Sequence, residues 1–176
     1  AFDKRYERSV TIGDFMIRLA QPDAPERVPG IAIYLTQSKD FIPEALALNL
    51  KHNSVVHERV VLLTVTTERV PRVAEEARLS TEELTCGFSR VELKFGFAEK
   101  PNVPATLITH AEALDFDATT ASYFLGRETP VPSLHPELPG WQERIYAFLA
   151  HNAVRAPDYY LIPPAQVVEL GTRVEM

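Results

Sequence analysis

Ile31-Ala32-Ile33-Tyr34-Leu35-Thr36 and Arg59-Val60-Val61-Leu62-Leu63-Thr64-Val65-Thr66 are the two stretches that decide the fold. Each is a continuous apolar run rich in β-branched residues, which is typical of strands buried on both faces of a parallel sheet. Between them, Leu46 and Leu50 follow Pro43 at helical spacing and predict a helix. A strand, a helix and a second strand in this order predict a right-handed βαβ unit.

The chain after this unit changes from continuous apolar runs to alternation. Residues Leu79–Thr85 and Phe88–Phe97 alternate apolar and polar side chains, with Cys86-Gly87 between them. This pattern predicts an antiparallel hairpin. We expect one face of its second strand to pack into the core, and that face carries Val91, Leu93, Phe95 and Phe97.

The remaining elements are predicted from shorter patterns. Apolar spacing after Thr11, whose side chain is a candidate N-cap, predicts a helix over residues 11–20. Further helices are expected over residues 103–113 and 141–152, and further strands over 122–125 and 165–174. We interpret two glycines as punctuation: Gly30 introduces the first strand, and Gly126 stops the strand that begins at residue 122.

Together these elements predict an α/β fold. We expect a single domain with a mixed, mainly parallel sheet, an inserted antiparallel hairpin and flanking helices. The length of 176 residues fits one domain. Residues 1–26 are expected to form a tether with a short helix, and residues 27–176 the α/β domain.

Composition excludes several classes of site. The closest two of the seven glycines, Gly87 and Gly96, are nine positions apart. This spacing rules out a dinucleotide-binding G-x-G-x-x-G, a P-loop and a G-x-S-x-G nucleophile elbow. Eighteen basic against 24 acidic residues give a net charge of −6, which argues against nucleic-acid binding. The one cysteine, Cys86, allows no internal disulfide and no multi-cysteine metal site.

No catalytic or metal-binding pattern stands out among the polar residues. The five histidines form no H-E-x-x-H metalloprotease motif. The adjacent acidic pairs Glu75-Glu76 and Glu82-Glu83 do not share a face, which makes them poor general acid–base partners. We therefore expect no enzyme activity, no cofactor and no metal site.

Polar residues at the expected carboxyl ends of three strands form the candidate ligand site. In an open α/β sheet, ligands bind in the crevice outside these ends, at the point where the strand order reverses. The candidate residues are Thr36, Gln37, Thr66, Thr67, Arg127 and Glu128. Their hydroxyl, amide and guanidinium groups suit a small polar or nucleotide-like ligand whose phosphates meet arginine and helix N-termini. Alternatively, Arg127 and Glu128 form an ion pair and the threonines only end their strands.

Seven strings of sequence, in order along the chain, carry a family resemblance. They are Arg27–Thr36, Asn49–Asn53, His57–Val65, Gly87–Val91, Tyr123–Thr129, Ile162–Pro164 and Val167–Thr172. In these strings the chain closely resembles the cytosolic C-terminal region of KUP-type potassium uptake proteins. The resemblance covers residues 27–176.

The resemblance implies that the chain is the soluble tail of a proton-coupled potassium symporter, at the cytoplasmic face of the bacterial inner membrane. Residues 1–26 would then be the juxtamembrane tether. The transmembrane part of the same transporter, which is absent from this chain, would be its partner. The resemblance also implies a homodimer, and in some relatives the cytosolic part responds to cyclic di-AMP.

The leading hypothesis is accordingly a regulatory and dimerising domain that does not itself conduct potassium. The alternative is a nucleotide sensor that holds cyclic di-AMP or an ATP-like ligand at Thr36, Thr66 and Arg127 and thereby controls transport. A stand-alone hydrolase is a third class. We expect dimers to form through the exposed face of the hairpin or through an unpaired strand edge.

Overall fold

The structure, a computed structural model, describes residues 10–131 and 160–175, with side chains over residues 10–126 and 160–171. The sheet within these ranges consists of β1 (Glu26–Leu35), β2 (Val55–Glu68), β3 (Leu79–Glu83), β4 (Phe88–Gly96), β5 (Ser122–Val131) and β6 (Val167–Glu175). The α-helices are α1 (Ile12–Leu19), α2 (Glu44–Asn53), α3 (Glu75–Arg78) and α4 (Val103–Thr109). Short 3-10 helices cover Ala111–Ala113 and Pro164–Gln166.

The strands form one sheet in the order β3-β4-β2-β1-β5-β6. All neighbouring pairs are parallel except β3 and β4, which form the predicted hairpin. β1, α2 and β2 form the predicted βαβ unit, with Leu35 opposite Leu63. The expected α/β fold with a mixed, mainly parallel sheet is therefore confirmed. The expected helix over residues 141–152 lies outside the described residues.

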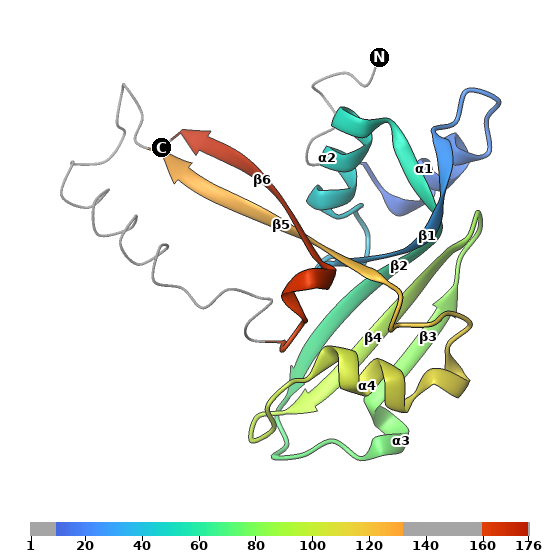
Figure 1. Cartoon of the computed structure of the whole chain (residues 1–176). Helices are drawn as coiled ribbons and strands as arrows, with labels where there is room; N and C mark the ends of the chain where they lie inside the picture. Colours follow the sequence, from blue (N-terminus) through green and yellow to red (C-terminus); the bar gives the residue numbers. More distant parts are fainter. Residues whose placement is uncertain (1–9, 132–159, 176) are drawn as a thin grey trace.

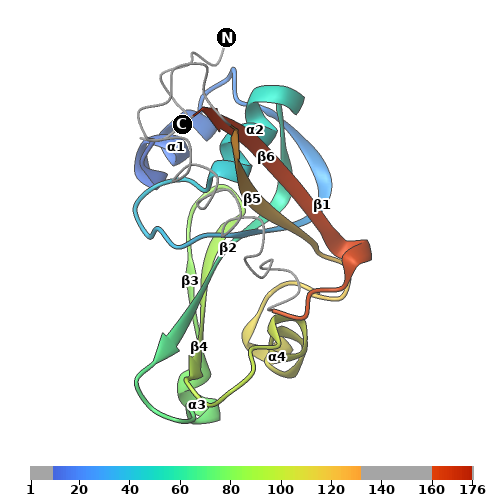
Figure 2. The same ribbon diagram turned by 90° about the vertical axis from the view of Figure 1, so that its left-hand side faces the viewer.

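The sheet has a hydrophobic core on each face. One core joins α1 and α2 to the sheet and includes Phe15, Tyr34, Leu46, Leu62 and Phe88. The other joins α4 and the segment before β5 to the opposite face and includes Ile33, Leu63, Val91, Leu107 and Tyr123. Figures 1 and 2 show α1 and α2 near one end of the molecule and α3 and α4 near the other. Because both faces of the sheet are covered, the central residues of β1 and β2 form continuous apolar runs in the sequence.

The first helix begins at the predicted N-cap. The Thr11 hydroxyl oxygen accepts a hydrogen bond from the backbone N–H of Asp14 at 3.1 Å, which satisfies one of the free donors of the first turn. Phe15 and Leu19 are buried, so α1 packs against the sheet as a part of the first core.

Two glycines that were predicted to mark strand ends lie inside strands. Gly30 lies inside β1 with a φ of +110°, and the pairing with β2 shifts register between Val28 and Ile31. This is a β-bulge, so the strand resumes after the break instead of starting there. β5 runs through Gly126, where a Cβ would lie 3.5 Å from the Glu44 carboxylate of α2. The glycine thus allows a helix to approach the strand closely.

The apolar face of β4 is shorter than predicted. Val91, Leu93 and Phe95 are buried, whereas Phe97 lies beyond the end of the strand and is 65% exposed. Its backbone N–H donates to the carbonyl of Val70 at 2.9 Å. The alternation of residue types therefore continues past the point at which the strand ends.

A single carboxylate holds together the loops that follow β2 and β4. Glu99 accepts hydrogen bonds from the backbone N–H groups of Gly96 and Val73 at 2.6 and 3.1 Å, and from the Arg78 guanidinium at 2.7 Å. The Arg78 hydrogen bond is the largest cause that lowers the pKa of Glu99 from 4.5 to about 2. Arg78 is buried and lies over the ring of Phe95, 5.2 Å from its centroid.

The substitution Glu99→Gln is expected to flatten the dependence of stability on pH. The folded-state pKa of Glu99 lies below its ordinary value, so the ionised carboxylate stabilises the fold above about pH 5. This stabilisation is lost as the pH falls toward about 2. Urea unfolding at a series of pH values measures the effect, and Glu76→Gln, at an exposed position of α3, is the matched control. Equal pH slopes for Glu99→Gln and the wild type would contradict the role given to Glu99.

Candidate functional site

A crevice lies at the carboxyl end of β1, beside the middle of β5, where the direction of the chain connections reverses. β1 continues through α2 to β2 on one side, whereas the crossover through α4 leads from β4 to β5 on the other side. β1 and β5 pair over three residues, Ala32–Tyr34 with Ser122–Phe124. The crevice has a volume of about 200 Å³ and is lined by Leu35, Thr36, Gln37, Leu63, Val65, Leu125, Gly126 and Tyr160. It is a topological switch point, the place where open α/β sheets bind ligands.

Thr36 and Gln37, two of the six candidate residues, line this crevice. The Thr36 hydroxyl accepts a hydrogen bond from the N–H of Ser38 at 3.1 Å and lies 3.2 Å from the Ser38 carbonyl oxygen. A local turn therefore uses this hydroxyl. The Gln37 side chain is exposed and makes no hydrogen bond with the described part of the chain. Its amide is thus available to a ligand.

Thr66 and Thr67 lie further along the sheet, outside the crevice lining. β2 extends five residues beyond Leu63, which is the partner of the last residue of β1. The Thr66 hydroxyl donates to the Glu92 carboxylate on β4 at 3.1 Å. The sequence-based prediction assumed that β1 and β2 end at the same level of the sheet. Because β2 is longer, Thr66 and Thr67 lie away from Thr36 and Gln37.

Arg127 and Glu128 belong to β5, where they lie opposite Gly171 and Thr172 of β6. Their side chains lie outside the described residues. The structure thus places the backbone of both residues next to Gly126 and the crevice. A contact between the Arg127 side chain and a ligand, or an ion pair with Glu128, stays a prediction.

Six of the eight lining residues were not among the candidates, and two of these, Gly126 and Tyr160, shape the crevice on the side away from β1. A Cβ on Gly126 would lie 3.7 Å from the backbone nitrogen of Ala45, so the first turn of α2 lies beside β5 at the crevice. A glycine inside a strand pattern signals the close approach of another backbone, and this signal could have identified Gly126. Tyr160 comes from a distant part of the chain, and no sequence signal marks it.

Groups with shifted pKa values lie away from the crevice. Burial raises the pKa of Tyr123 to about 12 and lowers the pKa of His57 below 6.5. The Tyr123 hydroxyl and His57 Nδ1 are buried and have no hydrogen-bond partner among the described residues. No three His, Cys, Asp or Glu side chains in residues 10–126 and 160–171 are placed to hold a metal ion. The described crevice has groups to bind a ligand but no activated acid, base or nucleophile.

The relatives of the chain among known proteins show its family. Residues 29–176 match the K+ potassium transporter C-terminal domain family. The chain belongs to this family. No solved structure matches it.

Three relatives of this potassium transporter C-terminal domain illustrate the match. It is 44% identical to a probable potassium transport system protein Kup of Caulobacter vibrioides, over 98% of this chain and 26% of the relative. It is 47% identical to a Kup 1 protein of Paramagnetospirillum magneticum, over 85% of this chain and 24% of the relative. It is 46% identical to a Kup protein of Azoarcus sp., over 93% of this chain and 26% of the relative.

This potassium transporter C-terminal domain therefore spans about a quarter of the length of the curated relatives it matches. The resemblance to KUP-type proteins is confirmed. Within residues 10–131 and 160–175, no helix has the length and apolar character needed to cross a bilayer. The names of the relatives describe potassium transport and not an enzyme activity.

Proposed function

We propose that this domain is a regulatory and dimerising part of a proton-coupled potassium uptake transporter, at the cytoplasmic face of the bacterial inner membrane. One observation carries the proposal: relatives named as potassium transport proteins match almost the whole chain, yet the match fills about a quarter of their length. The transmembrane part of such a protein is the first partner of the domain. The domain itself does not conduct potassium.

The crevice supports a regulatory role because its two sides belong to separate parts of the sheet. The β1 side is paired with β2 along most of its length, whereas β5 is joined to β1 by three residue pairs. A ligand that contacts both Gln37 and the backbone at Gly126 favours one spacing of these strands. Regulation requires such a difference in affinity between two arrangements. The first turn of α2, which lies against Gly126, moves with that spacing.

A nucleotide sensor is the second candidate function. The exposed Gln37 amide at the switch point favours it, and cyclic di-AMP or an ATP-like ligand is the proposed occupant. The described crevice, about 200 Å³, is smaller than the roughly 300–1,000 Å³ of small-molecule sites. It accommodates one part of a nucleotide and not the whole molecule.

Dimerisation is proposed through the outer edge of β6. Among the described residues, no strand pairs with that edge, and its backbone N–H and C=O groups can pair with a second copy. The opposite edge strand, β3, is five residues long and presents the exposed side chains of Glu82 and Glu83. Short length and charge both protect an edge against pairing.

Deletion of residues 27–176 from a full-length transporter is expected to change the rate of potassium uptake and to weaken dimer formation. Uptake is measured at equal amounts of protein in the membrane, and the oligomeric state by sedimentation of the purified transporter. The full-length variant Gln37→Ala separates the two effects: it removes one crevice group and leaves the β6 edge intact, so dimer formation is expected to stay unchanged. Unchanged uptake together with an unchanged oligomeric state after the deletion would contradict the regulatory and dimerising role.

Titration calorimetry of this chain with ATP and with cyclic di-AMP tests the nucleotide sensor.

A further inference from the structure

The loops that follow β2 and β4 form one tip at the end of the molecule. We call the loops over residues 69–74 and 97–102 the tip. They lie side by side, because the N–H of Phe97 donates to the Val70 carbonyl at 2.9 Å and the N–H of Ala98 donates to the Pro71 carbonyl at 3.1 Å. Figure 1 shows the tip at the far end of the sheet from α1.

The tip exposes two apolar side chains in a fixed arrangement. Val70 is 45% exposed and Phe97 is 65% exposed. A Cβ on Gly96 would lie 2.3 Å from the Pro71 carbonyl oxygen, so the two loops touch backbone to backbone. The Glu99 carboxylate accepts hydrogen bonds from the N–H groups of Gly96 and Val73 and so links the same two segments. The exposed positions of Val70 and Phe97 are therefore fixed by backbone contacts between the two segments.

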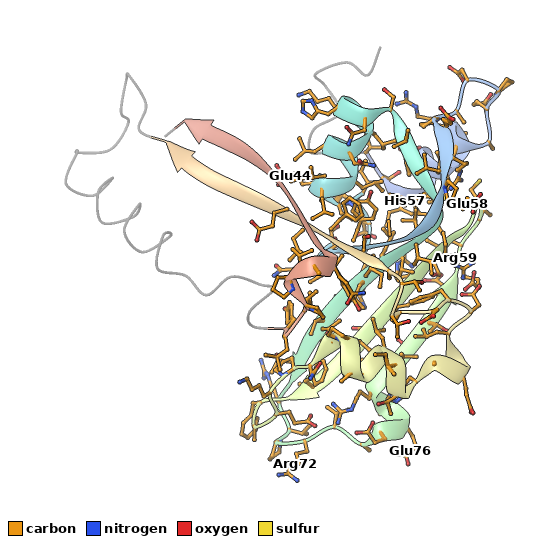
Figure 3. All side chains as sticks on the ribbon, viewed as in Figure 1. Glu44, His57, Glu58, Arg59, Arg72 and Glu76 are labelled. Atoms are coloured by element: carbon orange, nitrogen blue, oxygen red, sulfur yellow. The ribbon has the colours of Figure 1, made fainter. Side chains whose placement is uncertain are left out.

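The tip also carries the free cations of the described chain. Within the described side chains, the lysines and arginines without a hydrogen bond, ion pair or ring contact are Arg69, Arg72, Lys94 and Lys100, all on the tip or at the adjoining end of β4. The other described lysines and arginines all have partners. Figure 3 shows Arg72 at the extreme end of the molecule, directed away from the sheet.

The acidic residues near the tip cancel a part of this charge. Arg78 engages both Glu99 and Glu75, so its single charge offsets only one of these two carboxylates. Glu68 and Glu76 have no ion pair in the described structure. This end of the molecule thus holds five cations against four carboxylates, a small positive excess in a chain whose net charge is −6. Cations around exposed apolar side chains complement a surface that offers anionic groups above an apolar layer.

We propose that the tip docks onto an anionic lipid surface, with Val70 and Phe97 entering the interface and the four cations binding lipid phosphates. This inference rests on the proposed position of the domain at the membrane. Lipid fits better than the cytoplasmic loops of a transporter, because such loops are rich in lysine and arginine and repel a cationic tip. The tip and α1 lie at opposite ends of β2 (Figures 1 and 2). A domain tethered near α1 and docked by its tip therefore lies with β2 along the bilayer.

Vesicle sedimentation of this chain tests the proposal. Vesicles of phosphatidylcholine with phosphatidylglycerol are expected to bind the chain, vesicles of phosphatidylcholine alone to bind it much more weakly, and added salt to reduce binding. Arg72→Gln is expected to weaken binding about fivefold, and Phe97→Ser about tenfold. Because both side chains are exposed, the thermal unfolding midpoint of each variant is expected to stay near that of the wild type.

Matched variants distinguish the tip from general effects of charge and hydrophobicity. Ile108→Ser removes an apolar residue of α4 that is 50% exposed, between the values for Val70 and Phe97. Lys51→Gln removes an exposed charge on α2. Both are expected to bind vesicles as the wild type does. No binding to phosphatidylglycerol vesicles, or equal loss in the control variants, would overturn the proposal. A change of oligomeric state in Phe97→Ser without a change in vesicle binding would overturn it too, and would assign the tip to a protein interface. Loss of vesicle binding leaves the uptake experiment unaffected, so the two proposals fail separately.

Discussion

Replacement of Gly87 by alanine is expected to lower the free energy of unfolding by about 3 kcal/mol. Gly87 turns the β3–β4 hairpin with a φ of +75°, a conformation that costs an alanine about 1–2 kcal/mol. The added Cβ would also lie 2.3 Å from the Glu58 carbonyl oxygen, so backbone must shift to admit it. Urea unfolding at neutral pH measures the loss.

Gly13→Ala is the matched control for this prediction. Gly13 lies in α1, and the nearest atom to its added Cβ is the Thr11 hydroxyl at 3.9 Å. Alanine is favoured over glycine in a helix by about 1 kcal/mol, so this variant is expected to be slightly more stable than the wild type. Equal stability of Gly87→Ala and the wild type would show that the hairpin turn relaxes without cost.

The substitution Leu107→Ala is expected to cost about 3 kcal/mol. Leu107 is fully buried and fixes α4 to the second core. Its truncation removes apolar contacts and leaves a cavity in this core, which also contains Ile33 and Tyr123, because a close-packed interior relaxes only in part. For a chain of this length, the thermal midpoint is expected to fall by about 6–12 °C.

Ile108→Ala, one position further along α4, provides the comparison. Ile108 is 50% exposed, and a surface substitution of this kind is expected to change stability by less than about 0.5 kcal/mol. The two variants remove similar side chains from the same helix turn, so their difference measures burial. Similar losses for both would indicate that α4 is not held by Leu107.

The βαβ unit could be predicted from the sequence because its signal is local and strong. Ile33 and Tyr34 are both buried, on opposite faces of the sheet, and only a strand covered on both faces requires two adjacent apolar residues in this way. Gly30 and Gly126 were wrongly interpreted as strand boundaries. A glycine indicates a place where the backbone conformation is unusual or where another backbone lies close. A β-bulge or a closely packed helix explains a glycine as well as a strand end does.

The candidate site could be predicted only in part. Thr36 and Gln37 directly follow a strand whose end was clear, and they line the crevice. The prediction placed Thr66 with them because periodicity does not give the relative lengths of paired strands. In the structure β2 extends beyond the end of β1. The tip left no pattern in the sequence at all. The exposure of Phe97, and the absence of a partner for Arg72 among the described residues, depend on where β2 and β4 end and on which groups bind Glu99.

The pairing between β1 and β5 covers only three residues on each strand, so it divides the sheet into two parts that are each paired over longer stretches. β4, β2 and β1 share long ladders of backbone hydrogen bonds, and β5 and β6 share another. Local opening in proteins follows such boundaries, since the units that separate first have the fewest interactions across them. The β5–β6 ribbon is held across this seam by three residue pairs, by its packing on α2 and by the core side chains at the start of β5. It is thus the part of the sheet with the shortest backbone connection to the rest. Amide hydrogen exchange would register local opening in the ribbon before it reached β2.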